Sequence, residues 1–267
     1  MTGTGESERA AYDGFHVTAA DGGGVATITL DVPEKRNRVS MPAREQLATV
    51  FGELGTDPAV RFIVLQGAGE QAFTAGGDIA GFMERDPETL SRLAVNVAAP
   101  ERCPKPVIAK IRGYCLGVGL ELALACDFRV CADDAQLGLP EIGLGMIPGS
   151  GGTQRLVSLL GLSRAKDVIM RRRRISAADA HAWGLVSEVV PAAELDGAVD
   201  RVIADLEPLS PLALRVCKRV LNLAADAPLH VGLELEGLAY GMLRSSHDFA
   251  EGVDAFVDRR EPRFEGR

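Results

Sequence analysis

Two glutamates, Glu121 and Glu141, stand in sequence surroundings that suit acid and base chemistry. Glu121 follows the turn at residues 117–120 and opens an apolar run, and Glu141 follows Leu139-Pro140 and precedes a glycine-rich turn at 148–152. A carboxylate among apolar residues loses hydration, which raises its pKa and prepares it to exchange protons near neutral pH. We therefore expect both carboxylates, each beside a glycine-rich turn, to face one cavity.

Each glutamate also has a simpler interpretation, and both interpretations stay open at this point. Glu121 suits the first turn of a helix, where the helix dipole favours an acid, and Glu141 suits an exposed loop. Dinucleotide binding is not predicted, because Gly117-Val118-Gly119 begins a GxGxxG pattern that has Leu122 in place of its last glycine. Ser150 lies outside any GxSxG motif, so a nucleophile elbow is not predicted either.

Length and composition limit the class of protein. The chain has 267 residues, of which 46% are hydrophobic, and a formal net charge of −8. This length predicts one large domain with at most a small appendage, and the negative charge gives no support for a nucleic-acid partner. The apolar runs are too short to cross a membrane, so no membrane association is expected.

The N-terminus and the cysteines indicate a cytoplasmic protein. Residues 1–14 are polar and acidic, which predicts a flexible tail without the apolar segment of a secretory signal. The five cysteines form no CxxC pair and are interpreted as reduced thiols. The four histidines have no metal-ligand spacing, so no metal site is predicted.

The hydrophobic pattern predicts an α/β fold, because strands and helices alternate along the first two hundred residues. The expected strands are 25–30, 62–65, 107–111 and 128–132, and the expected helices are 41–54, 80–100, 120–125, 151–160 and one from about 163 to the arginines at 171–174. From Glu194 onward the pattern is helical throughout. We therefore divide the chain into a tail at 1–14, an α/β core at 15–205 and a C-terminal helical region at 206–267.

Two short segments suit ligand contacts as well as ordinary structure. Gly76-Gly77 suits a turn that exposes backbone amides, although taken alone these glycines fit an ordinary strand–helix loop better. The run Arg171–Arg174 is too short, and too poor in aromatic residues, for a nucleic-acid patch. A helix C-terminus, where cations offset the dipole, explains it better.

Several motifs in this order resemble the enoyl-CoA hydratase/isomerase (crotonase) family. The matching segments are Gly113-Tyr114, Gly117–Leu122, Cys126-Asp127, Leu139–Ile142 and Pro148–Leu156, with further matches at 71–79, at 175–186 and near Asp248–Phe256. No single segment is diagnostic, but their order and spacing together are specific. The resemblance covers roughly residues 24–264 and implies a crotonase-like ββα spiral core followed by a C-terminal helical oligomerisation region.

The resemblance also implies an activity, the reversible addition of water to a 2-enoyl-CoA thioester. It assigns Glu121 mainly to the attacking water and Glu141 mainly to the proton at Cα, with an enolate held by the backbone amides of Ala75 and Val118. Isomerase, C–C hydrolase or lyase chemistry through the same enolate, or a non-catalytic CoA-binding role, are the alternatives. The expected partner is an acyl-CoA substrate, and the expected assembly is a homotrimer or homohexamer.

The residues implied for CoA and substrate contact share a place in the family's binding loops or at its subunit boundary. They are Arg36, Arg38, Val39, Ala75, Gly76, Gly77, Asp78, Ile79, Gly117 and Arg259, the last of them toward the CoA of a neighbouring subunit. The resemblance implies no cofactor beyond the CoA carried by the substrate. The chain departs from the family's usual pattern at Val118, where most relatives have glycine and where we expect a narrower acyl pocket. It also departs at Asn37-Arg38-Val39 and at the four-arginine run.

Overall fold

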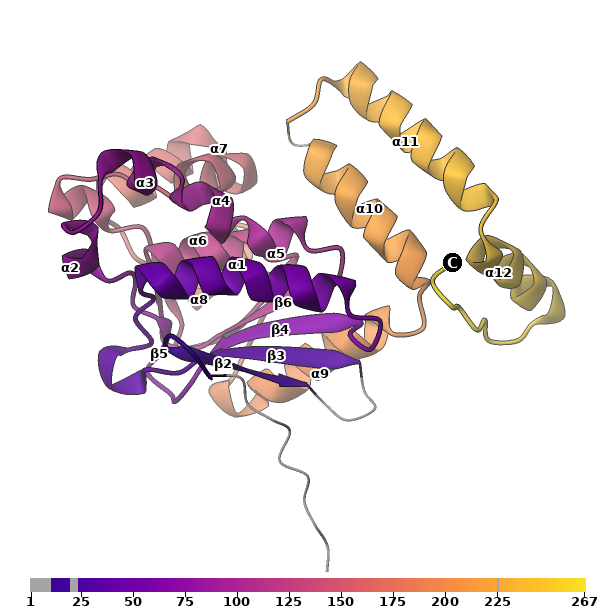
Figure 1. The fold of residues 1–267 in the computed structure, drawn as a ribbon, viewed down its shortest axis with the longest axis horizontal. Helices are drawn as coiled ribbons and strands as arrows, with labels where there is room; N and C mark the ends of the chain where they lie inside the picture. The colour runs from indigo at the N-terminus through magenta and orange to yellow at the C-terminus, as the bar shows by residue number, and fades with distance from the viewer. Residues whose placement is uncertain (1–10, 20–23, 225) are drawn as a thin grey trace, which may run out of the picture.

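The computed structural model describes residues 11–19, 24–224 and 226–267, and its larger sheet has seven strands. In spatial order these are β1 (Ala11–Tyr12), β2 (Phe15–Ala19), β3 (Val25–Leu30), β4 (Phe62–Gly67), β6 (Val107–Ile111), β8 (Phe128–Ala132) and β11 (Glu188–Val190). The first three strands pair antiparallel, and every later pair is parallel. Figure 1 shows this sheet at the base of the core.

A second sheet of four strands lies beside the first. Its order is β10 (Ile175–Ser176), β9 (Gln136–Gly138), β7 (Tyr114–Leu116) and β5 (Ala72–Thr74). The strands β5, β7 and β9 each follow a strand of the large sheet along the chain, and helical segments come next. This repeated strand–strand–helix unit is the predicted ββα spiral, so the expected fold class is confirmed.

The alternation of side chains along the parallel strands builds two hydrophobic layers. Ile63 and Leu65 belong to the main cluster, together with Leu47 of α1 (Met41–Thr56) and residues of α6 (Val118–Ala125). Val64 points to the other face, where it belongs to a smaller cluster with Ala198 of α9 (Leu195–Leu206). The large sheet is therefore covered on both faces, as a parallel sheet requires.

Short helices replace the single helix expected at 80–100, and that prediction was wrong. The segment forms α2 (Ile79–Phe82), α3 (Pro87–Ser91), α4 (Leu93–Val97) and α5 (Ala99–Arg102). The Asp86 side chain accepts a hydrogen bond from the amide of Thr89 at 2.9 Å, so it caps α3, and Pro87 occupies the first position of this new helix. A capping residue followed by proline restarts a helix and does not continue one.

The helix α7 (Gly152–Met170) combines the two helices expected at 151–160 and from about 163. Gly161 has non-helical angles, φ 76° and ψ 162°, and the kink that it makes lies between the two predicted helices. Before residue 207 the structure also has α8 (Ala177–Ala182) and three short 3₁₀ helices, η1 (Pro33–Lys35), η2 (Glu141–Leu144) and η3 (Ala192–Glu194). Residues 1–10 of the expected tail lie outside the described residues, whereas residues 11–12 form β1 and belong to the sheet.

Three helices form a C-terminal arm, which we define as residues 211–267. They are α10 (Pro211–Ala224), α11 (Leu229–Arg244) and α12 (His247–Asp258), and Figure 1 shows them at the side of the core. Lys218 Nζ joins α10 to the core through Asp127 Oδ2 at 2.6 Å and the carbonyl of Pro100 at 2.8 Å. None of the helices in the described part of the chain combines the length and the apolar character needed to span a membrane.

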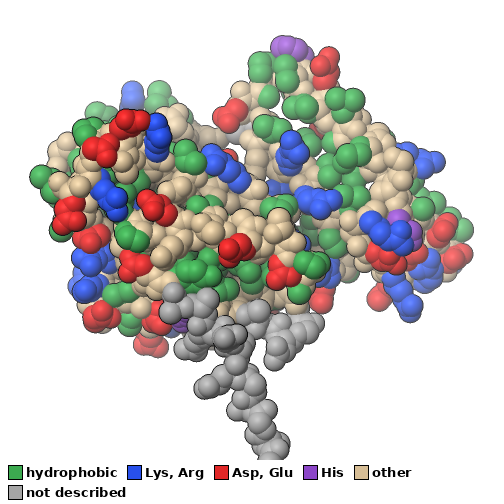
Figure 2. Space-filling model, in the orientation of Figure 1, with side chains coloured by type: hydrophobic (Ala, Val, Ile, Leu, Met, Phe, Trp, Pro, Cys, Tyr) green, Lys and Arg blue, Asp and Glu red, His purple; other side chains and the backbone are tan. Residues whose placement is uncertain are grey.

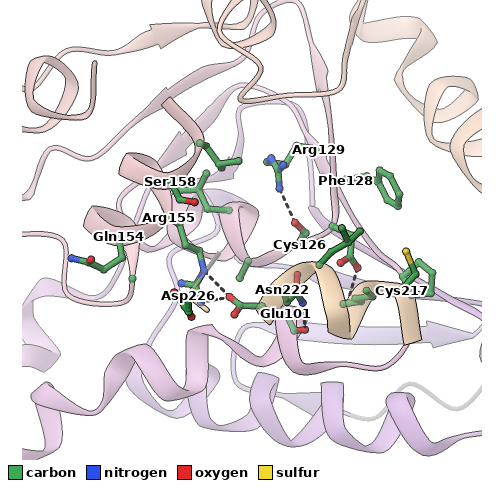
Figure 3. Close-up of a pocket in the computed structure, with 18 of the residues that line it drawn as sticks. Glu101, Cys126, Phe128, Arg129, Gln154, Arg155, Ser158, Cys217, Asn222 and Asp226 are labelled. Carbon is green, nitrogen blue, oxygen red and sulfur yellow. Dashed lines mark hydrogen bonds and ion pairs between the residues drawn. The ribbon is translucent and has the colours of Figure 1, made fainter. Parts of the chain in front are cut away.

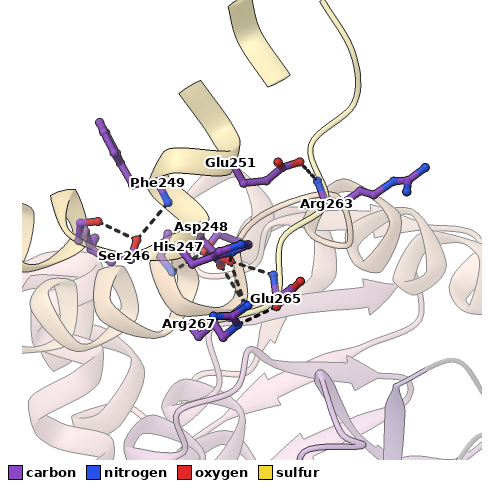
Figure 4. Close-up of polar contacts among 12 residues, drawn as sticks. Ser246, His247, Asp248, Phe249, Glu251, Arg263, Glu265 and Arg267 are labelled. Carbon is purple, nitrogen blue, oxygen red and sulfur yellow. Dashed lines mark hydrogen bonds and ion pairs between the residues drawn. The ribbon is translucent and has the colours of Figure 1, made fainter. Parts of the chain in front are cut away.

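The end of the chain folds back against the start of α12 (Figure 4). The buried carboxylate of Asp248 accepts the hydroxyl of Ser210 at 2.5 Å and the amide of Glu265 at 2.8 Å. Glu251 accepts the amide of Arg263 at 2.6 Å. These bonds tie the last residues to α12, and the bond from Ser210 ties α12 to the segment that precedes α10.

Candidate active site

Glu121 lies in the first turn of α6, and its side chain is 2% exposed. Its Oε1 accepts the backbone amides of Ser150 at 2.7 Å and Gly152 at 3.0 Å. Both donors belong to the turn that opens α7, where free amides and the helix dipole stabilise a negative charge. Gly152 is needed here, because a Cβ at this position would stand only 3.0 Å from the same oxygen.

Glu141 is the first residue of η2 and is held differently. Its Oε2 is buried and has no hydrogen-bond partner within the described residues. The pKa of Glu141 is raised to about 7, mainly by burial and also by the charge of Glu121, while a backbone hydrogen bond and the charge of Arg44 act in the opposite direction. Glu141 can therefore gain or lose a proton near neutral pH, which suits a general acid or base.

The two carboxylates converge on the start of α6. Gly117, the residue before this helix, has φ 57°. A Cβ on Gly117 would stand 3.1 Å from Glu141 Oε1, so the absence of a side chain lets Glu141 approach the helix. The strands β8 and β9 separate the glutamates along the chain and then return Glu141 to the turn that precedes Glu121.

The amide predicted at Ala75 is already used by the protein. Ala75 N–H donates to the carbonyl of Arg36 at 2.9 Å, so it is not free to receive charge from a ligand. The neighbouring amide of Gly76 donates to Thr74 Oγ1 at 3.1 Å, and that of Asp78 donates to the carbonyl of Val39 at 3.1 Å. The prediction for the Ala75 amide is thus contradicted by the path of the loop.

Gly77 supplies the amide that remains. Across the described part of the chain its N–H has no acceptor, because Gly76 and Asp78 on either side make the bonds to Val39. Gly76 has φ 126°, a value that L-residues rarely adopt, and this breaks the regular alternation of the loop. The pairing with residues 36–39 is a contact between distant segments, so no local signal in the sequence distinguished Gly77 from Ala75.

The amide of Val118 lies close to this loop. Val118 is the first residue of α6, and within the described residues its N–H has no acceptor. A Cβ on Gly117 would lie 3.8 Å from Gly76 Cα, and one on Gly76 would lie 3.6 Å from the carbonyl oxygen of Leu116. The loop that carries the free amide of Gly77 and the helix start that carries the free amide of Val118 are therefore in contact. The Val118 side chain is 3% exposed and packs in the main hydrophobic cluster, so it fills the core and is not the pocket residue we expected.

The other predicted ligand contacts divide by exposure. Arg38 pairs with Asp78 at 3.0 Å on the surface, and Ile79 is 53% exposed. The side chains of Arg38, Asp78 and Ile79 are therefore accessible to a ligand. Val39 is buried, which leaves only its backbone beside the loop. Arg259 ends α12, on the far side of the molecule from α2 (Figure 1), so a single chain does not bring it to the site.

The arginines flanking Tyr114 form a separate cationic group. The guanidinium carbons of Arg36 and Arg174 stand 5.4 Å and 5.2 Å from the centre of the Tyr114 ring. Two other arginines of the run have a structural partner, since Arg171 and Arg173 both bind Asp167 at 2.6 Å. Arg174 therefore shares Tyr114 with Arg36, a residue of the predicted CoA set.

Arg44 and Ser150 are site residues that the sequence analysis missed. Arg44 lies on the buried face of α1, and its Nη1 donates to Ser150 Oγ at 3.3 Å. The available signal was its spacing, because Arg44 stands three residues from both Met41 and Leu47 on one face of a helix. A charged residue in such an apolar stripe needs a polar environment inside the protein.

A cavity of about 870 Å³ lies elsewhere, between α10 and the core (Figure 3). Phe128, Arg155 and Cys217 are among its lining residues, whereas neither Glu121 nor Glu141 lines it. Arg155 pairs with Glu101 across it at 2.5 Å. The cavity thus belongs to the groove beside the C-terminal arm and not to the acid–base pair.

Comparison with known proteins identifies the family. Residues 20–267 match the family described as enoyl-CoA hydratase/isomerase. The chain belongs to the enoyl-CoA hydratase/isomerase family. Its members include a short-chain-enoyl-CoA hydratase of Clostridium acetobutylicum, 33% identical over 90% of this chain and 93% of that protein, and a 2,3-dehydroadipyl-CoA hydratase of Escherichia coli, 36% identical over 91% and 96%.

The solved structures of this family agree with the fold described above. The crystal structure of an enoyl-CoA hydratase from Bacillus anthracis superposes with a TM-score of 0.89 at 37% identity, and covers 96% of this chain and 100% of that one. The family resemblance found in the sequence is therefore confirmed. The match also extends through the C-terminal arm, since it includes nearly the whole chain.

Proposed function

We propose that this protein is an enoyl-CoA hydratase, which adds water reversibly across the double bond of a 2-enoyl-CoA thioester. The observation that carries the proposal is the pair Glu121 and Glu141 at the start of α6. One carboxylate is held by two amides, and the other has a pKa raised to about 7 and a buried oxygen without a partner. The hydratases among the relatives support the same class of reaction.

The reaction needs a base for water and an acid for carbon, and the two glutamates provide both. Glu121, fixed in position, orients the water and takes its proton as oxygen attacks Cβ. Glu141, in its protonated form, delivers a proton to Cα. The pair holds one proton before and after the reaction, because the proton gained by Glu121 balances the one lost by Glu141.

Negative charge builds up on the thioester oxygen during the attack. We assign its stabilisation to the amides of Gly77 and Val118, and the position of Val118 at the start of a helix adds the favourable end of the helix dipole. Donors fixed in the main chain need no rearrangement as the charge develops. This assignment replaces Ala75 with Gly77 and keeps Val118.

The CoA part of the substrate is expected along the loop that carries Gly76 and Ile79. Arg36 and Arg38 are exposed beside this loop, and a guanidinium offers phosphate a planar pair of donors. We propose that the substrate is held as its CoA thioester, with no metal and no nicotinamide. Retained activity after treatment with a chelator supports a metal-free reaction, and activity on the free acid contradicts the need for a CoA thioester.

A cytoplasmic location remains a prediction from the sequence.

The arm supports a proposal about assembly. Its helices α10 and α11 contain no buried residue among those described, although they carry many apolar side chains, which Figure 2 shows gathered on the arm. Leu229, Leu238 and Phe256 are 78%, 74% and 84% exposed. Patches of this kind mark contact surfaces, and we propose that the protein forms the homotrimer or homohexamer that the family resemblance implies.

Products of a panel of enoyl-CoA esters test the proposed reaction. The panel covers crotonyl-CoA and longer or branched 2-enoyl-CoA esters, and mass analysis detects the products. Hydration adds one water to the substrate. An isomerase leaves the mass unchanged, a C–C hydrolase or lyase yields two fragments, and a non-catalytic CoA-binding protein gives no turnover, so each of these outcomes contradicts the proposal.

A further inference from the structure

Arg44 is a buried cation at the centre of the site, and the proposed reaction gives it no role. Its side chain is only 4% exposed. Its Nη1 donates to Ser150 Oγ at 3.3 Å, and its guanidinium carbon stands 5.2 Å from the centre of the Phe82 ring. A Cβ on Gly77 would stand 2.5 Å from its Nη2, so the loop that offers the free amide lies directly on this guanidinium.

Packing alone does not explain a charge in this position. Arg44 forms no ion pair with a carboxylate in the described ranges, and its Nε is buried without a partner. Arg129 provides the contrast, because this other buried arginine donates to the carbonyls of Leu185, Cys126 and Ala123 at 2.7, 2.6 and 3.3 Å. Burying a cation with few hydrogen bonds is costly unless nearby opposite charges compensate it.

The compensating charges are the two glutamates. Burial lowers the pKa of Arg44, and the charges of Glu121 and then Glu141 raise it. The contact with Ser150 also leads to Glu121, because the amide of Ser150 is one of the two donors that hold Glu121 Oε1. Arg44 is therefore linked to one carboxylate through a shared neighbour and to both through its charge.

We propose that Arg44 is a positioning residue of this site: its guanidinium fixes Ser150 against Glu121, supports the loop at Gly77, and is the buried counter-charge of the two glutamates. Three charged groups face Glu141 or its helix η2: Glu121 from α6, Arg44 from α1, and Arg172, whose guanidinium lies against Gly143. Of these, Glu121 opposes ionisation of Glu141 and Arg44 favours it, so removal of Arg44 leaves two carboxylates without a buried counter-charge.

The titration of Glu141 tests this without any turnover. The protein is labelled with ¹³C at the glutamate carboxyl carbons, and the Glu141 signal is assigned by its loss in Glu141→Gln. In Arg44→Met, which keeps a long apolar side chain, we expect the midpoint to move upward by roughly one pH unit. Arg44→Lys keeps the charge and is expected to hold the midpoint close to that of the wild type. Arg92→Gln, which removes an exposed arginine paired with Glu88, is the matched control for net charge and is expected to change nothing.

The pH profile of kcat/KM provides the second readout and rests on the proposed function. We expect the alkaline limb of Arg44→Met to shift with the NMR midpoint, and kcat to fall because Ser150 and Glu121 lose their support. An unchanged midpoint in Arg44→Met overturns the inference. If Arg44→Met and Arg44→Gln both fail to fold while Arg44→Lys folds, the charge is structural and the inference is also overturned. A shifted midpoint in a protein that hydrates no enoyl-CoA supports the role of Arg44 and rejects only the hydratase proposal.

Discussion

At the level of single residues, the two glutamates differ in how much freedom each has. Glu121 is fixed by two backbone donors, whereas Glu141 has an oxygen without a partner and a pKa raised to about 7. A fixed carboxylate suits the orientation of water, and a carboxyl group near its midpoint suits transfer of a proton to carbon. The division of roles that the family resemblance implies, with Glu121 on the water and Glu141 on the Cα proton, stays a prediction, which the following variants test.

Replacing either acid with an amide of the same shape tests these roles. Glu121→Gln and Glu141→Gln should each lower kcat by roughly 10²–10⁴, the usual contribution of a positioned proton-transfer group. Binding of a CoA ester should survive, because neither carboxylate lies among the proposed CoA contacts. The measurement is steady-state hydration of crotonyl-CoA together with calorimetric titration of a saturated acyl-CoA. Near-normal hydration by one variant would remove that residue from the mechanism.

The pH dependence follows from the single proton that the pair must hold. Glu141 is protonated below about pH 7 and ionised above it. We therefore expect kcat/KM to fall as pH rises through about 7, approaching a tenfold loss per pH unit. Hydration and dehydration should lose activity together, because the pair carries the same total number of protons in both directions. A profile that is flat from pH 6 to 9 would contradict the assignment.

The same glutamate has a consequence for stability. Its pKa is raised in the folded protein above the ordinary value of 4.5, so the folded state binds the proton more tightly than the unfolded state. The stabilising contribution of the protonated Glu141 side chain is fully present below about pH 4.5 and is lost as the pH rises through about 7. We expect Glu141→Gln to have a higher Tm than the wild type at pH 8 and a smaller advantage at pH 5, as measured by thermal unfolding. An equal difference at both values would argue against a buried, ionisable Glu141.

At the level of elements, the start of α6 joins the carboxylates to the proposed oxyanion donors. Val118→Pro deletes the N–H at the first helical position, where proline is tolerated. Loss of one such donor costs about 2.7–4 kcal/mol, or roughly 10²–10³ in kcat. Val118→Gly keeps the amide and should keep kcat within a few-fold, but it removes a side chain from the core and should lower stability by about 1–3 kcal/mol. A folded Val118→Pro enzyme with normal turnover would place the oxyanion donors elsewhere.

Sequence patterns predicted the two strands that precede the glutamates along the chain more accurately than the segment at 80–100. Strands 107–111 and 128–132 have the predicted bounds, because each is a short apolar run that is buried in a parallel sheet. In segment 80–100 a helical spacing of apolar residues concealed Asp86 and Pro87, which restart the helix. The error at Ala75 has another cause, since which amide is free depends on a bridge between Val39 and Gly77 that joins distant parts of the chain.

At the level of the whole molecule, the arm is attached to the core by few polar contacts and leaves much apolar surface exposed. We expect static light scattering to give the mass of a trimer or a hexamer. Leu238→Asp places a charge on α11 and should lower the oligomeric mass, whereas Glu236→Gln on the same helix should not. A monomer with full activity would contradict the proposed assembly.

The spiral order of strands could not be derived from periodicity. The alternation of strands and helices predicted an α/β fold, but the division into two sheets depends on β5, β7 and β9, which are only three residues long. Runs of this length carry too little pattern to be assigned as strands. The family resemblance provided the architecture, which the strand order of the two sheets confirms.

The two amides proposed to hold the enolate belong to the main chain, and this affects how the protein can evolve. A substitution changes a side chain and leaves the N–H in place, so of the twenty amino acids only proline deletes such a donor. Val118 illustrates the point, because its side chain is buried in the core while its amide stays available. Mutations around the site can therefore alter substrate preference without deleting the N–H groups that are proposed to stabilise the enolate.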